Sequence, residues 1–162
     1  MRPRALADLV ERIADAADRV GAVCAVAESL TSGRLAAQVG RGPSAQDWFA
    51  GGVVAYQVRV KEDVLGLAPG TDPCSPECAE QLARGVRALL RADVAVSTTG
   101  VGGPDPQDGH APGTVYLGWA TADAAGHQLL RFDGEPVEVI DQAVEAALNL
   151  LLSTLDDTRP GG

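Results

Sequence analysis

Basic side chains are scarce in this sequence. Lys and Arg number 13 against 22 Asp and Glu, which gives the 162-residue chain a formal net charge of −9. A nucleic-acid surface needs a basic stripe, so we expect no nucleic-acid partner. A single nucleotide needs only one local cationic group, and this charge balance leaves such a ligand open.

Long apolar runs are missing as well. No stretch reaches membrane-spanning length and the N-terminus is charged, so we expect neither a membrane partner nor a signal peptide.

Three cysteines, an odd number, fit a reducing cytoplasm better than a disulfide scaffold. Cys74 and Cys78 lack the second Cys/His pair that would complete a zinc site, so we expect no metal.

Aromatic residues make up only 4% of the chain, while 46% of it is hydrophobic. The core must therefore be built mostly from Ala, Val and Leu. A chain of this length fits one domain with a real core. Trp48 and Phe49 stand together, and their default role is packing, although a stacking wall for an aromatic ligand is an alternative.

Hydrophobic periodicity predicts alternating strands and helices. The expected strands are 22–27, 51–56, 93–98, 113–120 and 127–132, and the expected helices are 3–20, a segment ending near residue 40, 57–65, 76–91 and 135–155. The last two strands are expected to form an antiparallel hairpin, and Ser75 is expected to cap the helix that begins at residue 76. This order predicts an α/β fold, a single three-layer α/β/α sandwich with a mixed sheet. The polar tail, 156–162, is expected to be flexible.

The stretch 23–38 reads as a strand, a polar turn and a helix. Thr31 or Ser32 is expected to cap the helix. Ser29 then lies at the carboxyl end of a strand, close to a helix N-terminus that suits a phosphate or a developing oxyanion. Taken alone, the stretch is more typical of ordinary turn and cap residues, because capping by Ser and Thr is common.

Three strand ends carry unusual polar residues. Ser29 follows the first strand, Tyr56 and Lys61 follow the second, and the Gly-rich segment 98–103 follows the third. Ligands in open α/β sheets gather at the carboxyl ends of parallel strands, so parallel pairing would bring these groups together. A serine beside a lysine of lowered pKa makes a nucleophile, and glycine-rich backbone can present amides to phosphate.

A histidine offers a competing base. His110 lies in the long loop near Asp105 and Asp108, so a Ser-His-Asp arrangement is conceivable, although a polar loop favours a solvent-exposed histidine.

Taken together, four motifs resemble the CinA C-terminal domain family, the pyridine-nucleotide amidase module, over about residues 5–153. They are Ala27-Glu28-Ser29-x-Thr31-x-Gly33, then Gly51-Gly52-Val53-Val54-Ala55-Tyr56 with Lys61 and Leu65-Gly66, then Ser97-Thr98-Thr99-Gly100-x-x-Gly103-Pro104, then Pro112-Gly113-Thr114-Val115-Tyr116.

The resemblance implies a single amidase domain that converts nicotinamide mononucleotide to nicotinate mononucleotide and ammonia without cofactor or metal. It implies Ser29 as the nucleophile, with Tyr56 and Lys61 as its assisting residues. The substrate-binding residues that it implies are Glu28, Thr31, Gly33, Thr98, Thr99 and Gly100.

The chain also departs from the family pattern. Leu30 and Ser32 replace the usual Cys and Gly, Gln57-Val58 replaces a Ser-Asn pair, and Pro136 and Ile140 occupy the region where two arginines are common. These changes favour the alternative of a catalytically quiet nucleotide-binding or assembly module, whereas the retention of Ser29, Tyr56 and Lys61 together favours the enzyme. A serine hydrolase acting on another small amide is a third hypothesis. Alanine-rich helix faces would permit a homo-oligomer.

Overall fold

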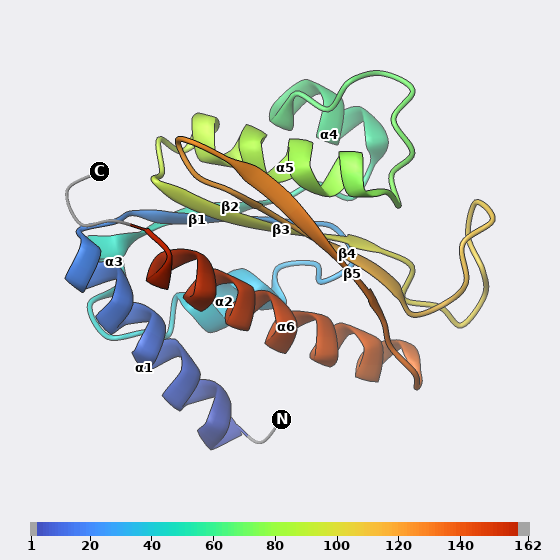
Figure 1. Cartoon of the computed structure of the whole chain (residues 1–162). Coiled ribbons are helices and arrows are strands. Elements are labelled where there is room, and N and C mark those ends of the chain that lie inside the picture. Colours follow the sequence, from blue (N-terminus) through green and yellow to red (C-terminus); the bar gives the residue numbers. More distant parts are fainter. Residues whose placement is uncertain (1–2, 159–162) are drawn as a thin grey trace.

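A five-stranded mixed sheet lies between two layers of helices (Figure 1). The computed structural model describes residues 3–158. Its strands are β1 (Cys24–Glu28), β2 (Phe49–Val54), β3 (Val94–Gly100), β4 (Thr114–Ala120) and β5 (Ala125–Arg131). Its helices are α1 (Pro3–Val20), α2 (Arg34–Val39), α3 (Ala45–Trp48), α4 (Val58–Leu65), α5 (Pro76–Leu89) and α6 (Pro136–Asp156). The predicted single α/β domain is confirmed. Of the tail that was expected to be flexible, residues 159–162 lie outside the described residues. Its first residue, Asp156, is the last residue of α6.

The sheet order β2-β1-β3-β4-β5 puts β1 between two parallel neighbours. Glu28 at the end of β1 stands opposite Val54 of β2 and Thr98 of β3. The carboxyl ends of these three strands therefore meet at one edge of the sheet. The parallel pairing on which the expected convergence depended is present.

Two apolar clusters fill the spaces on either side of the sheet. The larger joins α1, α2 and α6 to one face, and the smaller joins α4 and α5 to the other. In Figure 1, α4 and α5 lie above the sheet, while α1, α2 and α6 lie below it. Valine, leucine and alanine supply most of both clusters, as the shortage of aromatics predicts. Trp48 is buried in the larger cluster, which is the packing role rather than a ligand wall.

Two differences from the sequence-based boundaries affect the site. Strand β2 ends at Val54, so Tyr56 lies in the connection to α4 rather than in the strand. Helix α2 begins at Arg34 with Gly33 as its N-cap at φ 98°, and neither Thr31 nor Ser32 caps it. By contrast, Ser75 caps α5 as expected, since its side chain accepts from the amide of Cys78.

Among residues 3–158, every helix is either too short or too polar to span a membrane.

We predict that Gly85→Ala destabilises the fold. A Cβ atom at Gly85 in α5 would lie 1.9 Å from the carbonyl oxygen of Leu65, where α4 ends. Alanine in a helix interior normally adds about 1 kcal/mol over glycine. Overpacking against backbone outweighs this gain, so the free energy of unfolding should fall by about 2 kcal/mol in urea titration.

Gly102→Ala is the matched control, since a Cβ there meets nothing within 4 Å. Equal stability of the two variants would contradict the close approach of α5 to the end of α4.

Candidate active site

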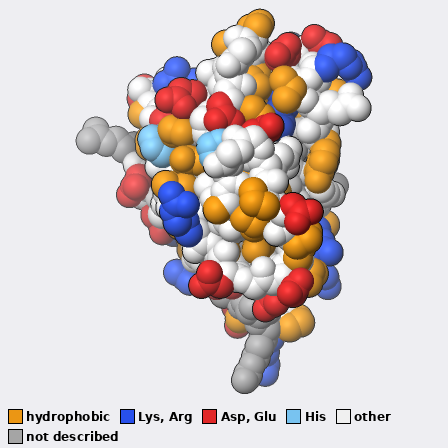
Figure 2. Space-filling view, turned by 90° about the vertical axis from the view of Figure 1, so that its right-hand side faces the viewer, with side chains coloured by type: hydrophobic (Ala, Val, Ile, Leu, Met, Phe, Trp, Pro, Cys, Tyr) orange, Lys and Arg blue, Asp and Glu red, His pale blue; other side chains and the backbone are white. Residues whose placement is uncertain are grey.

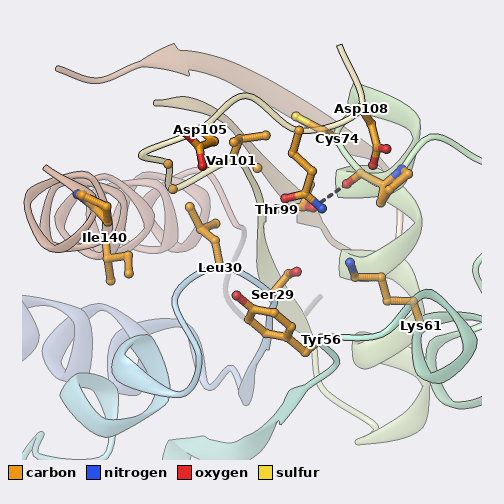
Figure 3. A pocket seen from close by; sticks show the side chains of 16 residues that line it. Ser29, Leu30, Tyr56, Lys61, Cys74, Thr99, Val101, Asp105, Asp108 and Ile140 are labelled. Atoms are coloured by element: carbon orange, nitrogen blue, oxygen red, sulfur yellow. Dashed lines mark hydrogen bonds between the residues drawn. The ribbon is translucent and has the colours of Figure 1, made fainter. Parts of the chain in front are cut away.

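A cavity of about 310 Å³ opens at the edge where the parallel strands end (Figure 3). It is lined by the residues after β1, the start of α4, the 66–75 connection, the loop after β3 and the first turns of α6. Small-molecule pockets span about 300–1,000 Å³, so this one has room for a small ligand only. Five of the predicted site residues line it, namely Ser29, Tyr56, Lys61, Thr99 and Gly100.

Ser29 is the first residue after β1, and backbone hydrogen bonds hold it there. Its amide donates to the carbonyl of Thr98 over 3.1 Å, and its carbonyl accepts from the amide of Ser32 over 3.1 Å. The side chain is nearly buried but lines the cavity. The nucleophile candidate is thus tied to both β3 and the turn that follows it.

The carboxylate of Glu28 organises this turn from beneath. Glu28 is 1% exposed, and its Oε1 accepts from Thr31 Oγ1 over 2.6 Å and from the amide of Leu35 over 2.8 Å. Its Oε2 accepts from the amide of Ala36 over 3.0 Å. A carboxylate suits the positive end of a helix, and it satisfies amides that would otherwise lack acceptors.

This network changes the expected use of the α2 N-terminus. Glu28 occupies the amides of Leu35 and Ala36, so they are not free for the phosphate or oxyanion that the sequence suggested. The amide of Leu30 remains: it belongs to a residue of the cavity wall and, within residues 3–158, donates to no protein acceptor.

Glu28, Thr31, Thr98 and Gly33 lie behind the cavity wall rather than in it. The hydroxyls of Thr31 and Thr98 are 2.8 Å apart and join Glu28 in one buried chain of hydrogen bonds. Gly33 supplies the left-handed backbone that starts α2. This placement fits a supporting role, holding the Ser29 turn between β1 and β3, better than direct contact with a substrate.

Lys61 enters the cavity from the other side, on the first turn of α4. Lys61 is only 3% exposed, and its amine forms no ion pair among residues 3–158. Burial lowers the pKa of Lys61 below its usual value, against the opposing influence of Cys78 and Cys74. Burial also raises the pKa of Cys74 to about 11, so its thiol is neutral near pH 7. Lys61 is therefore a buried amine without a nearby counter-charge.

Tyr56 lies at the mouth of the cavity and is 67% exposed. In Figure 3 the amine of Lys61 points toward the hydroxyl of Ser29, and the ring of Tyr56 lies below both. No hydrogen bond directly joins these three side chains in the described structure. Catalytic hydrogen bonds are often long in the absence of a substrate and shorten when it binds. The relevant observation is therefore that the three side chains lie around the same part of the cavity.

Two loops form the upper wall. Thr99 Oγ1 donates to the carbonyl of Pro73, drawn as a dashed line in Figure 3. His110 Nε2 lies 2.8 Å from Asp72 Oδ2, which ties the loop after β3 to the loop before α5. His110 does not line the cavity, so the Ser-His-Asp alternative has no support in this geometry.

Sequence reasoning missed several residues of the wall. Asp105 and Asp108 were considered only as partners of His110, and Cys74 only as a metal ligand, yet all three line the cavity. Pro136 and Ile140 complete the wall from α6. The length of the loop after β3 was the one signal that pointed here. Within residues 3–158, no three metal-binding side chains gather in one place.

The fold and the site define a class: a single α/β domain with a small cavity at the carboxyl edge of its parallel strands. The profile of the CinA C-terminal domain family matches residues 6–155, and the chain belongs to this family.

Similar proteins and similar solved structures indicate the same family. A competence-damage inducible protein of Bacillus velezensis is 38% identical over 152 residues, which cover 91% of this chain and 36% of that protein. A CinA-like protein of Frankia casuarinae is 37% identical over 134 residues, 80% of this chain and 31% of that protein. The chain thus spans about a third of these relatives.

Among solved structures, competence damage-inducible protein A of Klebsiella pneumoniae superposes with a TM-score of 0.90. It is 28% identical, with 95% of this chain and 99% of that one covered. The competence/damage inducible protein CihA of Agrobacterium tumefaciens has a TM-score of 0.89 at 26% identity, covering 97% and 99%.

We predict that Glu28→Gln weakens the fold. The amide keeps the shape but loses the charge, and its NH2 group meets donors instead of acceptors. Hydrogen bonds to charged groups contribute about 1.5–3 kcal/mol, so we expect a loss of about 2 kcal/mol in the free energy of unfolding. Glu11→Gln, on the exposed face of α1, should change it by less than about 0.5 kcal/mol. Equal urea midpoints for the two variants would refute the role given to Glu28.

We predict that Lys61→Met stabilises the fold near neutral pH by about 1–2 kcal/mol, because an apolar isostere has no charge to desolvate. Since burial lowers the pKa of Lys61, the unfolded chain holds this proton more tightly than the folded one. The disadvantage of lysine is therefore largest below the folded pKa and vanishes as pH rises to the ordinary value of 10.5. Unfolding titrations at several pH values should show the advantage of methionine shrinking with pH. A less stable methionine variant would contradict the view of Lys61 as an unpaired buried amine.

Proposed function

We propose that this domain is a serine amidase that hydrolyses the carboxamide of nicotinamide mononucleotide to nicotinate mononucleotide and ammonia. One observation carries the proposal: the Ser29 hydroxyl and the buried, unpaired amine of Lys61 share one small cavity. The family contains nicotinamide mononucleotide amidases, which agrees with this chemistry.

The first step needs a base for the serine proton. A lysine of lowered pKa has a neutral fraction near pH 7, and this form can accept the proton as Ser29 Oγ attacks the carboxamide carbon. A carboxylate beside Lys61 would hold the amine protonated, and no carboxylate is among the groups that shift its pKa. Because Lys61 has no salt bridge within residues 3–158, it is suited to act as the base for the serine proton.

The second step needs a donor for the negative oxygen of the tetrahedral intermediate. The amide of Leu30, directly after the nucleophile, belongs to a lining residue and has no protein acceptor within residues 3–158, so it can serve as this donor. Such a donor typically contributes about 3 kcal/mol to lowering the barrier. Collapse then breaks the C–N bond, and the Lys61 ammonium returns its proton to the departing nitrogen, which leaves as ammonia.

Water completes the cycle by attacking the ester between Ser29 and the acyl group. Lys61, neutral again, accepts a proton from this water, and the acid product leaves with the Ser29 hydroxyl restored. Tyr56 stands at the mouth, where its ring and phenol can orient the substrate and the lysine. Thr99 and Gly100 border the opposite wall, and Glu28, Thr31 and Thr98 act as positioning residues behind it.

We expect Ser29→Ala to retain its fold and to release ammonia from the mononucleotide about 10⁴-fold more slowly or worse, because the nucleophile is lost. Ammonia release from the full chain and circular dichroism are the two measurements. Ser153→Ala is the control: the Ser153 hydroxyl is on α6 and donates to the carbonyl of Leu150, so this variant should match the parent protein in both.

Ammonia release by Ser29→Ala close to that of the parent would exclude the serine mechanism. A parent chain that binds nucleotide but turns over none would instead favour the quiet binding module. Turnover of nicotinamide or glutamine in preference to the mononucleotide would favour a hydrolase of another small amide.

A further inference from the structure

The charges around the cavity are unevenly placed. Among its lining residues the charged ones are Lys61, Asp105 and Asp108. Lys61 is buried, whereas both aspartates are exposed on the loop after β3. In Figure 3 they stand on the upper side, with Asp105 toward Ile140 and Asp108 toward Cys74. The exposed part of the cavity lining therefore carries two negative charges, whereas Lys61, the basic residue among the lining residues, is buried.

Among the described side chains of the cavity lining, a phosphate group finds no basic partner other than Lys61. A phosphate monoester carries a charge of about −1.5 to −2 at pH 7, and proteins usually hold it with arginine, lysine or a free helix N-terminus. The N-terminus of α2 is already occupied by Glu28. The wall formed by α6 is apolar, with Pro136 and Ile140.

The arginines on the neighbouring elements are also engaged elsewhere. Arg34 of α2 pairs with Asp141 over 3.1 Å, and Arg59 of α4 lies 3.6 Å from Asp63. Neither arginine lines the cavity. Among the residues that do, Lys61 is the one cation, and the proposed mechanism needs it neutral beside the carboxamide rather than bound to phosphate.

The same two aspartates suit the other part of the substrate. A nicotinamide ring joined through its nitrogen to ribose is a pyridinium cation, which attracts carboxylates. The ribose hydroxyls are donors, and carboxylate oxygens accept hydrogen bonds readily. Asp105 and Asp108 thus match the charge of the ring and the hydroxyls of the sugar, but repel a phosphate.

We propose that the cavity selects the cationic pyridinium nucleoside and that Asp105 and Asp108 set this specificity. The inference rests on the proposed amidase activity and names its substrate class more closely. Nicotinamide riboside, which lacks the phosphate, is then deamidated with a higher kcat/KM than nicotinamide mononucleotide.

The test measures ammonia release from both compounds by the full chain, with kcat/KM determined at low salt and at 0.5 M salt. The ratio of riboside to mononucleotide is expected to exceed one and to fall toward one as salt screens the repulsion. Asp105→Asn and Asp108→Asn should each lower this ratio by about two- to fivefold, the range for single exposed charge interactions. Ile140→Arg, which adds a cation to the wall, should lower it further by favouring the mononucleotide.

Asp123→Asn is the control for overall charge. It removes the same charge from the exposed turn between β4 and β5, away from the cavity, and should leave the ratio unchanged. Binding of each compound to Ser29→Ala, followed by calorimetry, gives the same comparison without turnover and should rank the riboside first.

The outcomes separate the two proposals. Release of ammonia from neither compound would overturn the amidase function and this inference with it. A second outcome is that both compounds are turned over, the mononucleotide is preferred, and the aspartate variants leave the ratio unchanged. This outcome would overturn the proposed specificity but not the amidase function. Such a result would mean that a cation from outside this cavity, for example from a second copy of the chain, holds the phosphate.

Discussion

The buried carboxylate of Glu28 is the contact on which the site depends. Glu28 is the last residue of β1, and its carboxylate accepts hydrogen bonds from two backbone amides at the start of α2 and from the hydroxyl of Thr31. The Thr31 hydroxyl is in turn hydrogen-bonded to that of Thr98 in β3. A charge so deeply buried is tolerated only when its oxygens are satisfied, and three donors satisfy them here. Because Ser29 is the next residue, the position of its hydroxyl follows from this network and from the parallel pairing of β1 with β3.

Lys61 presents the opposite situation. Glu28 is buried with several partners, whereas Lys61 is buried beside neutral thiols and forms no ion pair in the described chain. A buried amine of this kind weakens the fold, and the same desolvation lowers its pKa toward the range where it can accept a proton. Stability and reactivity are therefore opposed at this position. In the proposed mechanism, Glu28 holds the nucleophile in place and Lys61 acts as its base.

Much of this arrangement could be predicted from the residues. The order of strands and helices, the antiparallel hairpin and the Ser75 cap follow from periodicity and cap chemistry, which act over short stretches. The strand-end pattern singled out Ser29, Tyr56 and Lys61, and the family resemblance implied their catalytic roles. Local reasoning failed at the start of α2, because the residue that accepts its amides is Glu28, which lies in the preceding strand. It also could not identify the partner of His110, because Asp72 comes from another loop.

What the sequence determined by itself is the α/β architecture and the polar residues at each strand end, because these depend on the character of neighbouring residues along the chain. Only the tertiary structure decided how each polar group is used. It placed Glu28, Thr31 and Thr98 behind the wall, Lys61 in the cavity without a partner, and Asp105 and Asp108 at its upper side. The reason is physical: burial, pKa and charge complementarity are set by distances between residues far apart in the chain, which no local pattern records.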